Sequence, residues 1–446
     1  DAILSANKAE EYFGLRSARE ALDLDPTYEP AQIVFISLAL DKTGGKGESI
    51  HNLLGTVNPN LLTAVLERAL TDRRQAVVLG TIKALGELAE VRASKGKSLS
   101  EPVLVRSLYY PDRRVQLAAA EALIRIPSKS GPPSVGRIVD ILKRGAASEP
   151  QEKSSPKIVV GFFKDAVGQE IANAVEKAGF TPVRVKTGRE AITRLGEAAD
   201  IDGLLLDAQL PDPGLSQLLA QLRSDANVGL LPIVLAAPRE GIEALRRHLE
   251  NYRNVSVIPA PQALDVDTLK RVLKEPNPDN ASQPLTDAER KEQAETSLRL
   301  LARLRQLGQP ISTLEPAADV LVNALAFPKL SKETMTDVLD TVGELPGQKP
   351  QRQLAAFVAD PKQPVNLRVT AAGDLVRHIQ QYGLLLTPAQ VETVVQLYEA
   401  KGSDPKLREK IASFLGSLRP DAKKTGERLI DFNALEKAPA PPSKEK

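Results

Sequence analysis

Tyr110 to Ile126, YPDRRVQLAAAEALIRI, carries the clearest structural signal in this chain of 446 residues. Its apolar residues follow at steps of three and four, which is the spacing of one face of an α-helix. The stripe is narrow and rich in alanine, so it suits close packing against a neighbouring helix. A turn at Tyr110-Pro111-Asp112 separates it from a shorter helical pattern upstream. The segment therefore predicts a helix-turn-helix unit.

This unit repeats along the chain. A shift of 38 residues superposes Leu66 on Leu104, Val77 on Val115 and Ala84 on Ala122. A shift of 40 residues near the C-terminus superposes Leu367-Arg368 on Leu407-Arg408. Two-helix units of this length bury their apolar faces only by stacking on one another. The pattern predicts an α-solenoid.

Two Asp-Pro pairs lie just upstream of the C-terminal copies, at Asp360-Pro361 and Asp404-Pro405. Aspartate caps helix N-termini and proline fits the first turn of a helix. Each pair therefore predicts the start of a helix.

The period changes in the middle of the chain. Short apolar or β-branched runs alternate there with helical patterns, which predicts a parallel sheet covered on both faces. The expected strands contain residues 158–160, 183–185, 203–206, 233–235 and 255–258. Proline-rich polar stretches flank this region and are typical of linkers.

The repeats resemble HEAT repeats in period, layout and turn residues, and Ala21 to Pro26 is similar to the seam between tetratricopeptide (TPR) repeats. An ordinary helical hairpin remains the alternative for the N-terminus.

The middle region resembles a response-regulator receiver domain, because Asp207 ends the third strand and is followed by Leu210-Pro211, as a phospho-acceptor is in that family. The combination resembles chains of planctomycete-type bacteria. The predicted organisation is a TPR-like hairpin (1–42), HEAT-like repeats (43–148), a linker (149–156), a degenerate receiver-like α/β domain of flavodoxin-like (βα)5 type (157–275), a linker (276–285), C-terminal HEAT-like repeats (286–433) and a disordered tail (434–446).

The receiver resemblance also implies what is missing. The family holds Mg²⁺ with two acidic residues after the first strand, and Gly161 and Phe162 stand there. Its hydroxyl residue corresponds to Ala237 and its lysine to Ala260. Hard oxygen ligands are needed to hold Mg²⁺, so we expect no metal, no cofactor and no catalytic residue. Asp207 is expected to be a vestigial acceptor.

Two features suggest contacts with partners. Adjacent Phe162 and Phe163 lie at the rim of the expected sheet and either fill the vacated acidic pocket or contact a partner or the flanking solenoid. Arginine pairs occupy corresponding turns of two repeats and form either solvated turns or a basic ridge for phosphate or an acidic protein face. These pairs are Arg73-Arg74 and Arg113-Arg114.

Composition limits the remaining functions. The chain has no cysteine and three histidines, which excludes Cys/His zinc sites and disulfides. A net charge of +2 and the absence of tryptophan disfavour nucleic acid as a partner. No run approaches the length of about 18 apolar residues that a membrane span requires. The chain starts at Asp1 instead of methionine, so a removed leader is one alternative, and the location stays open between cytoplasm and periplasm.

The sequence thus favours a non-enzymatic scaffold that binds unidentified proteins, with self-association as one option. The alternative is an atypical signalling receiver, regulated at Asp207 by phosphorylation or by a metal-independent ligand. An enzyme of unrecognised type is the third hypothesis, and no motif in the sequence supports it.

Overall fold

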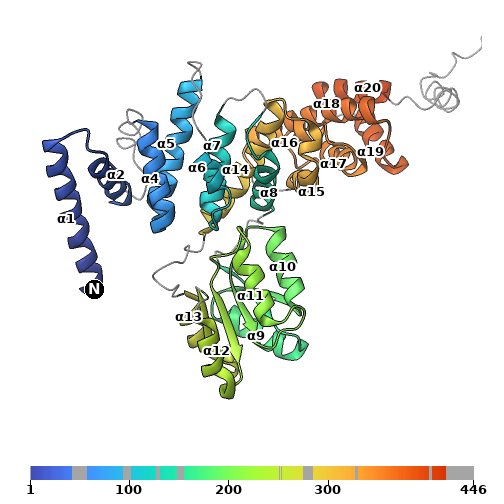
Figure 1. The fold of residues 1–446 in the computed structure, drawn as a ribbon. Helices are drawn as coiled ribbons and strands as arrows, with labels where there is room; N and C mark the ends of the chain where they lie inside the picture. The colour runs from blue at the N-terminus through green and yellow to red at the C-terminus, as the bar shows by residue number, and fades with distance from the viewer. Residues whose placement is uncertain are drawn as a thin grey trace, which may run out of the picture. The chain divides into compact units, whose positions relative to one another are not determined.

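The computed structural model describes residues 2–42, 58–93, 102–126, 131–147, 155–250, 252, 254–274, 285–326, 330–400 and 404–417. Across these residues the chain is mostly helical and contains a five-stranded parallel sheet (Figure 1). It divides into two compact units, residues 1–308 and 309–446. The predicted tail 434–446 and most of the predicted linkers 149–156 and 276–285 lie outside the described residues.

The helices that precede the sheet in the first unit pack as successive neighbours, α1 on α2, α4 on α5 and α5 on α7. Their bounds are α1 Ala2–Leu24, α2 Glu29–Lys42, α4 Pro59–Asp72, α5 Gln75–Ala93, α6 Pro102–Ser107, α7 Arg113–Arg125 and α8 Val135–Ala146. Asp112 sets the start of α7, because its carboxylate accepts hydrogen bonds from the N–H groups of Arg114 and Val115. The turn seen in the sequence therefore ends in a helix N-cap.

The strands pair in the order β2-β1-β3-β4-β5, and all of them are parallel. Each predicted strand run lies within a strand of the structure. The bounds are β1 Lys157–Gly161, β2 Thr181–Val185, β3 Ile201–Asp207, β4 Ile233–Ala237 and β5 Val255–Pro259.

Helices cover both faces of the sheet. Alternate strand residues such as Val160 and Leu205 pack against α9 (Asp165–Lys177) and α13 (Val266–Lys274). Their neighbours, such as Val159 and Leu204, pack against α10 (Gly188–Glu197), α11 (Leu215–Ser224) and α12 (Ile242–Leu249). Short 3₁₀ turns follow the last two strands, η1 Arg239–Gly241 and η2 Ala260–Leu264. Covering both faces explains why β1 and β4 are buried along their whole length and consist mostly of apolar residues.

The helical packing continues across the α/β insertion. The helix that follows the α/β domain, α14 (Asp287–Gln306), packs against α8, the helix that precedes it. Gly145 of α8 permits this approach, since a Cβ at that position would lie 2.4 Å from the Ser297 hydroxyl oxygen. The α/β domain therefore interrupts the sequence of the helical stack but not its packing.

The second unit is helical throughout its described residues. Its elements are η3 Ile311–Thr313, η4 Glu315–Ala317, α15 Ala318–Ala324, α16 Lys332–Val342, α17 Gln348–Ala359, α18 Val365–Tyr382, α19 Pro388–Glu399 and α20 Pro405–Ser417. Helix α18 packs against α16, α17 and α20.

The two Asp-Pro pairs of this unit behave differently. Asp404 accepts hydrogen bonds from the N–H groups of Lys406 and Leu407, and α20 begins at Pro405, as predicted. The prediction for Asp360-Pro361 is wrong, because Asp360 ends α17 and α18 begins only at Val365. The cause is a second proline, Pro364, which disfavours helical backbone in the residue before it.

None of the described helices combines the length and apolarity needed to cross a bilayer.

Candidate functional site

Asp207 is the last residue of β3 and lies at the edge of the sheet where all the parallel strands end. Its side chain is partly exposed, and Oδ1 accepts a hydrogen bond from the backbone N–H of Gln209 at 2.9 Å. Ligands of doubly wound sheets bind at this carboxyl edge. The surroundings of Asp207 are therefore the first candidate site.

The neighbouring position at the end of β1 has no room for an acidic side chain. A Cβ added to Gly161 would lie 2.7 Å from Leu206 Cδ2 and 3.1 Å from Leu210 Cδ2. These two leucines are buried and fill the space beside the last residue of β1. An acid at this position would have to displace core side chains.

The ends of β4 and β5 add no polar chemistry. Ala237 ends β4 and is buried, and Ala260 follows β5 directly. Phosphoryl transfer to a carboxylate depends on a divalent cation that several oxygen ligands hold. Within the parts of the chain that the structure describes, no three acidic or histidine side chains gather in a way that could hold a metal ion.

Asp165 and Asp212, two further acids near this edge, are engaged with cations. Asp165 is the first residue of α9 and pairs with Arg184 and Lys186, each at 2.8 Å. The hydrogen bond from Lys186 holds the pKa of Asp165 below its usual range. Asp212 pairs with Arg189 at 3.1 Å, and this hydrogen bond likewise lowers the pKa of Asp212. Both carboxylates therefore point to basic partners.

The adjacent phenylalanines have different environments. Phe162 is 4% exposed and belongs to the core beneath α9 and α13. Phe163 is 61% exposed, and Val167, one turn into α9, is also exposed. The first ring fills the interior, and the second leaves an apolar surface beside the carboxyl edge.

The opposite, amino edge of the sheet holds a buried ionic cluster. Asp202, near the start of β3, has a side chain only 1% exposed. One carboxylate oxygen accepts from Arg113 of α7 at 2.6 Å, and the other pairs with Arg290 of α14. The second oxygen also accepts from the backbone N–H of Lys157 at 2.8 Å. A single carboxylate thus joins α7, α14 and the sheet itself.

Asp200 extends this cluster by two ion pairs. Its buried carboxylate accepts from Lys157 Nζ at 2.6 Å and from Arg194 at 2.9 Å. Burial alone would raise the pKa of Asp200, but the hydrogen bonds and charges of Arg194 and Lys157 hold it below its usual range. Arg290 also donates to the Asp200 carbonyl at 2.8 Å. The amino edge is therefore a connected network rather than isolated pairs.

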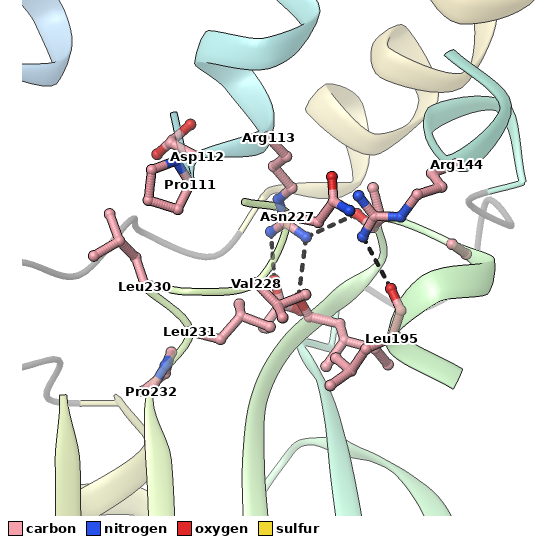
Figure 2. Close-up of a pocket in the computed structure, with 14 residues that line it drawn as sticks. Pro111, Asp112, Arg113, Arg144, Leu195, Asn227, Val228, Leu230, Leu231 and Pro232 are labelled. Carbon is pink, nitrogen blue, oxygen red and sulfur yellow. Dashed lines mark hydrogen bonds and ion pairs between the residues drawn. The ribbon is translucent and has the colours of Figure 1, made fainter. Parts of the chain in front are cut away.

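Helix α8 contributes a further arginine at this seam. Arg144 is buried and donates to the carbonyl of Leu195 at 2.9 Å, while its own carbonyl accepts from the N–H of Ala199. Arg113 and Arg144 line a small cavity of about 30 Å³ together with Asn227 and Leu231. Figure 2 shows these side chains. This size suits an ordered water molecule and not a substrate.

The other arginines singled out in the sequence have different environments. Arg114 pairs with Glu289 at 3.4 Å, so it also links α7 to the residues of α14. Arg73 ends α4 in the left-handed conformation, and it and Arg74 are partly exposed. Neither alternative given for the turn arginines, solvated turns or a basic ridge, holds for Arg113, whose side chain is 13% exposed and pairs with the buried carboxylate of Asp202.

Burial of the cluster disfavours the charged forms of its side chains. It lowers the pKa of Arg113, and the charge of Asp202 acts in the opposite direction. Removing one member of a buried ion pair leaves the other charge unpaired, which costs far more than losing an exposed pair. Loss of one member is therefore expected to weaken the attachment of the α/β domain to α7 and α14.

Sequence reasoning missed Asp200, Asp202 and Arg290. The available signal was Asp200-Ile201-Asp202 just before the apolar run Leu204 to Leu206, where an acid needs a partner on burial. Its partners lie 88 or more residues away along the chain, at Arg113 and Arg290, so no local spacing identifies them.

Searches against protein-family models and curated protein sequences find no match to this chain.

Proposed function

We propose that this chain is a non-catalytic scaffold for protein–protein interaction, built from HEAT-like helical repeats that carry a pseudo-receiver module. The observation that carries the proposal is the difference between the two edges of the sheet. The amino edge is used inside the molecule, where Asp202 binds Arg113 and Arg290. The carboxyl edge offers an exposed Phe163 and an acceptor carboxylate beside apolar strand ends.

The packing of the helices supports the repeat part of the proposal. Helices α5 and α7 are the longer members of the two units related by the 38-residue shift, and they pack directly on each other. Stacking of successive units in this way is how solenoids build extended binding surfaces. The hairpin of α1 and α2 fits a TPR-like first unit.

The sheet supports the pseudo-receiver part. The strand order 2-1-3-4-5 is one of the two common doubly wound orders, and it is the order of receiver-type folds. Asp207 ends the central strand of this sheet, beside Ala237 and Gly161. In a receiver, the residues that hold the divalent cation correspond to Gly161 and Phe162 of this chain, and neither side chain offers an oxygen ligand.

The scaffold proposal is tested with a surface variant. Phe163→Asp places a charge on the exposed apolar surface without touching the core, and Val365→Asp, at an exposed position on α18, is the matched control. Proteins that co-purify with the wild-type chain at physiological salt should be lost with Phe163→Asp and kept with Val365→Asp. Equal recovery with both variants, or a chain that stays a lone monomer under every condition, contradicts the proposal.

The second candidate function is regulation at Asp207, which its partial exposure favours. Incubation with a small phosphodonor and Mg²⁺, followed by intact-mass measurement, separates the two candidates. The scaffold proposal expects no added phosphoryl mass. Added mass that disappears in Asp207→Asn establishes the receiver function instead.

A further inference from the structure

One face of α18 contacts the turn that joins α16 to α17. The contacting side chains are Asp374, His378 and Tyr382, which lie one helical turn apart and therefore on the same face. Tyr382 donates its hydroxyl hydrogen to the carbonyl of Glu344 at 2.7 Å, and His378 Nε2 donates to the carbonyl of Leu345 at 2.8 Å. Two of the three contacts are thus hydrogen bonds to backbone oxygens of the turn.

The third contact depends on a glycine. A Cβ on Gly343 would lie 2.8 Å from the Asp374 Cβ and 3.3 Å from its Cγ, so only glycine lets the turn approach this closely. Asp374 is 1% exposed as a result. A carboxyl group buried this deeply against backbone has lost its water, which disfavours its charged form.

The hydrogen bonding of Asp374 is incomplete while it is ionised. Oδ1 pairs with Arg377, but Oδ2 has no hydrogen-bond partner among the described residues. Protonation turns an oxygen of this carboxyl into a donor, and the carboxylate of Asp340 on α16 is the acceptor within reach. The neutral acid therefore satisfies the site better than the carboxylate does.

The charged groups that act on Asp374 are Arg377 and Asp340. Arg377 is 54% exposed and also pairs with Asp340 at 3.1 Å, so solvent and a second acid weaken its hold on Asp374. Burial raises the pKa of Asp374 to about 7, and the Asp340 charge acts in the same direction against Arg377.

The other helices packed on α18 bring no opposing charge into its buried face. From α17, the uncharged Gln351 faces His378, whereas Lys349 is exposed and Arg352 donates to the carbonyl of Leu385. From α20, the buried side chains are Leu407, Ile411 and Phe414, and the charged side chains that lie at exposed positions are Lys406, Arg408, Glu409 and Lys410.

We propose that the contact between α18 and the turn at residues 343–345 is a proton-dependent latch, which is tight while Asp374 carries a proton and loosens when Asp374 ionises. The ionised carboxylate faces the backbone of Gly343 and the carboxylate of Asp340. Movement of the turn away from α18 lets water reach this charge, which stabilises the ionised form. This regulation lies in the second unit and is independent of the proposed function.

The direction of the pH dependence follows from the pKa of Asp374, which lies above its ordinary value of 3.8. The stabilisation is complete below that ordinary value and is lost as the pH rises through about 7. The second unit should therefore become less stable between mildly acidic and mildly alkaline solution, within the physiological range.

Thermal unfolding of the full chain tests the latch with Asp374→Asn, whose amide mimics the protonated acid and cannot ionise. The wild type should unfold below this variant at both pH values, and the gap should be wider by about 4 °C or more at pH 8 than at pH 5. Glu409→Gln, which removes an exposed carboxyl from α20, should follow the wild type at both pH values. Parallel pH profiles for the wild type and Asp374→Asn overturn the proposal.

Hydrogen exchange of the wild-type chain tests it without a variant. After correction for the intrinsic pH dependence of exchange, amides of residues 343–347 should exchange about tenfold faster at pH 8 than at pH 6. Amides in α5, in the other unit, should show no such change. Equal protection of the turn at both pH values overturns the latch.

Discussion

Arg113, at the start of α7, and Arg290, on the first helix after the α/β insertion, bind opposite oxygens of one buried carboxylate. That carboxylate belongs to Asp202 of the insertion itself. Three segments that are far apart in sequence therefore share one ionic contact. The contact is asymmetric, because two cations depend on a single anion.

The first prediction follows from this dependence. Asp202→Asn removes the anion and leaves two buried guanidinium groups without it, so the chain should lose about 3–5 kcal/mol of stability. Denaturant unfolding measures the loss, and hydrogen exchange should show α14 deprotected. Asp267→Asn, at a 93% exposed side chain, should change stability by less than about 0.5 kcal/mol. Equal effects of the two variants would show that the ionic cluster does not hold the insertion.

The second prediction concerns two glycines of the C-terminal unit. Gly343→Ala forces a methyl group to 2.8 Å from the Asp374 Cβ, and overpacking of this kind costs about 1–3 kcal/mol. Gly373→Ala adds the same methyl group within α18, where it meets nothing within 4 Å. Because alanine favours helix over glycine, the second variant should gain about 0.5–1 kcal/mol. Opposite signs in thermal unfolding are expected, and a gain from Gly343→Ala would contradict the close approach.

The third prediction uses the adjacent phenylalanines as a matched pair. Phe162→Ala empties a core position and should cost about 3–5 kcal/mol. Phe163→Ala removes a ring that is mostly exposed and should cost less than about 0.5 kcal/mol. Urea denaturation of the two variants measures the difference. Similar losses would place both rings in the core.

The fourth prediction is a pH dependence of opposite sign to that of Asp374. Burial lowers the pKa of His378 from 6.5, and its Nδ1 accepts from Gln351 while Nε2 donates to Leu345, so the folded chain holds it neutral. Because the unfolded chain takes up this proton first, stability should fall as the pH drops below about 6.5. His378→Gln, introduced beside Asp374→Asn, should remove this slope between pH 7.5 and 5.5. An unchanged slope would assign it to another group.

The sequence predicted the elements of the fold where the pattern is local. Short apolar or β-branched runs identified the strands, and Asp112 and Asp404 marked helix starts through contacts two and three residues away. It failed at Asp360-Pro361, because the effect of Pro364 on the residue before it outweighs the Asp-Pro signal. The start of α18 is therefore set by Pro364 and not by the Asp-Pro pair.

The sites were less predictable, because their partners are distant. Phe162 and Phe163 are adjacent and identical in type, so only the direction of each side chain from the backbone separates core from surface. In the sequence, Arg113 has the features of an arginine in an exposed turn, and only the folded chain places Asp202 beside it. The environment of Asp374 depends in the same way on Asp340 and Gly343, which belong to another helix and its following turn.

The contact of α8 with α14, with Gly145 against Ser297, has a consequence for how such a chain can change. Because the helical stack closes directly behind the α/β domain, exchanging that domain for another would not cut the stack. A replacement would have to present one acid to Arg113 and Arg290, whereas its loops at the far edge would be free to diverge. During evolution another domain with such an acid can therefore replace this one without disrupting the packing of α8 on α14.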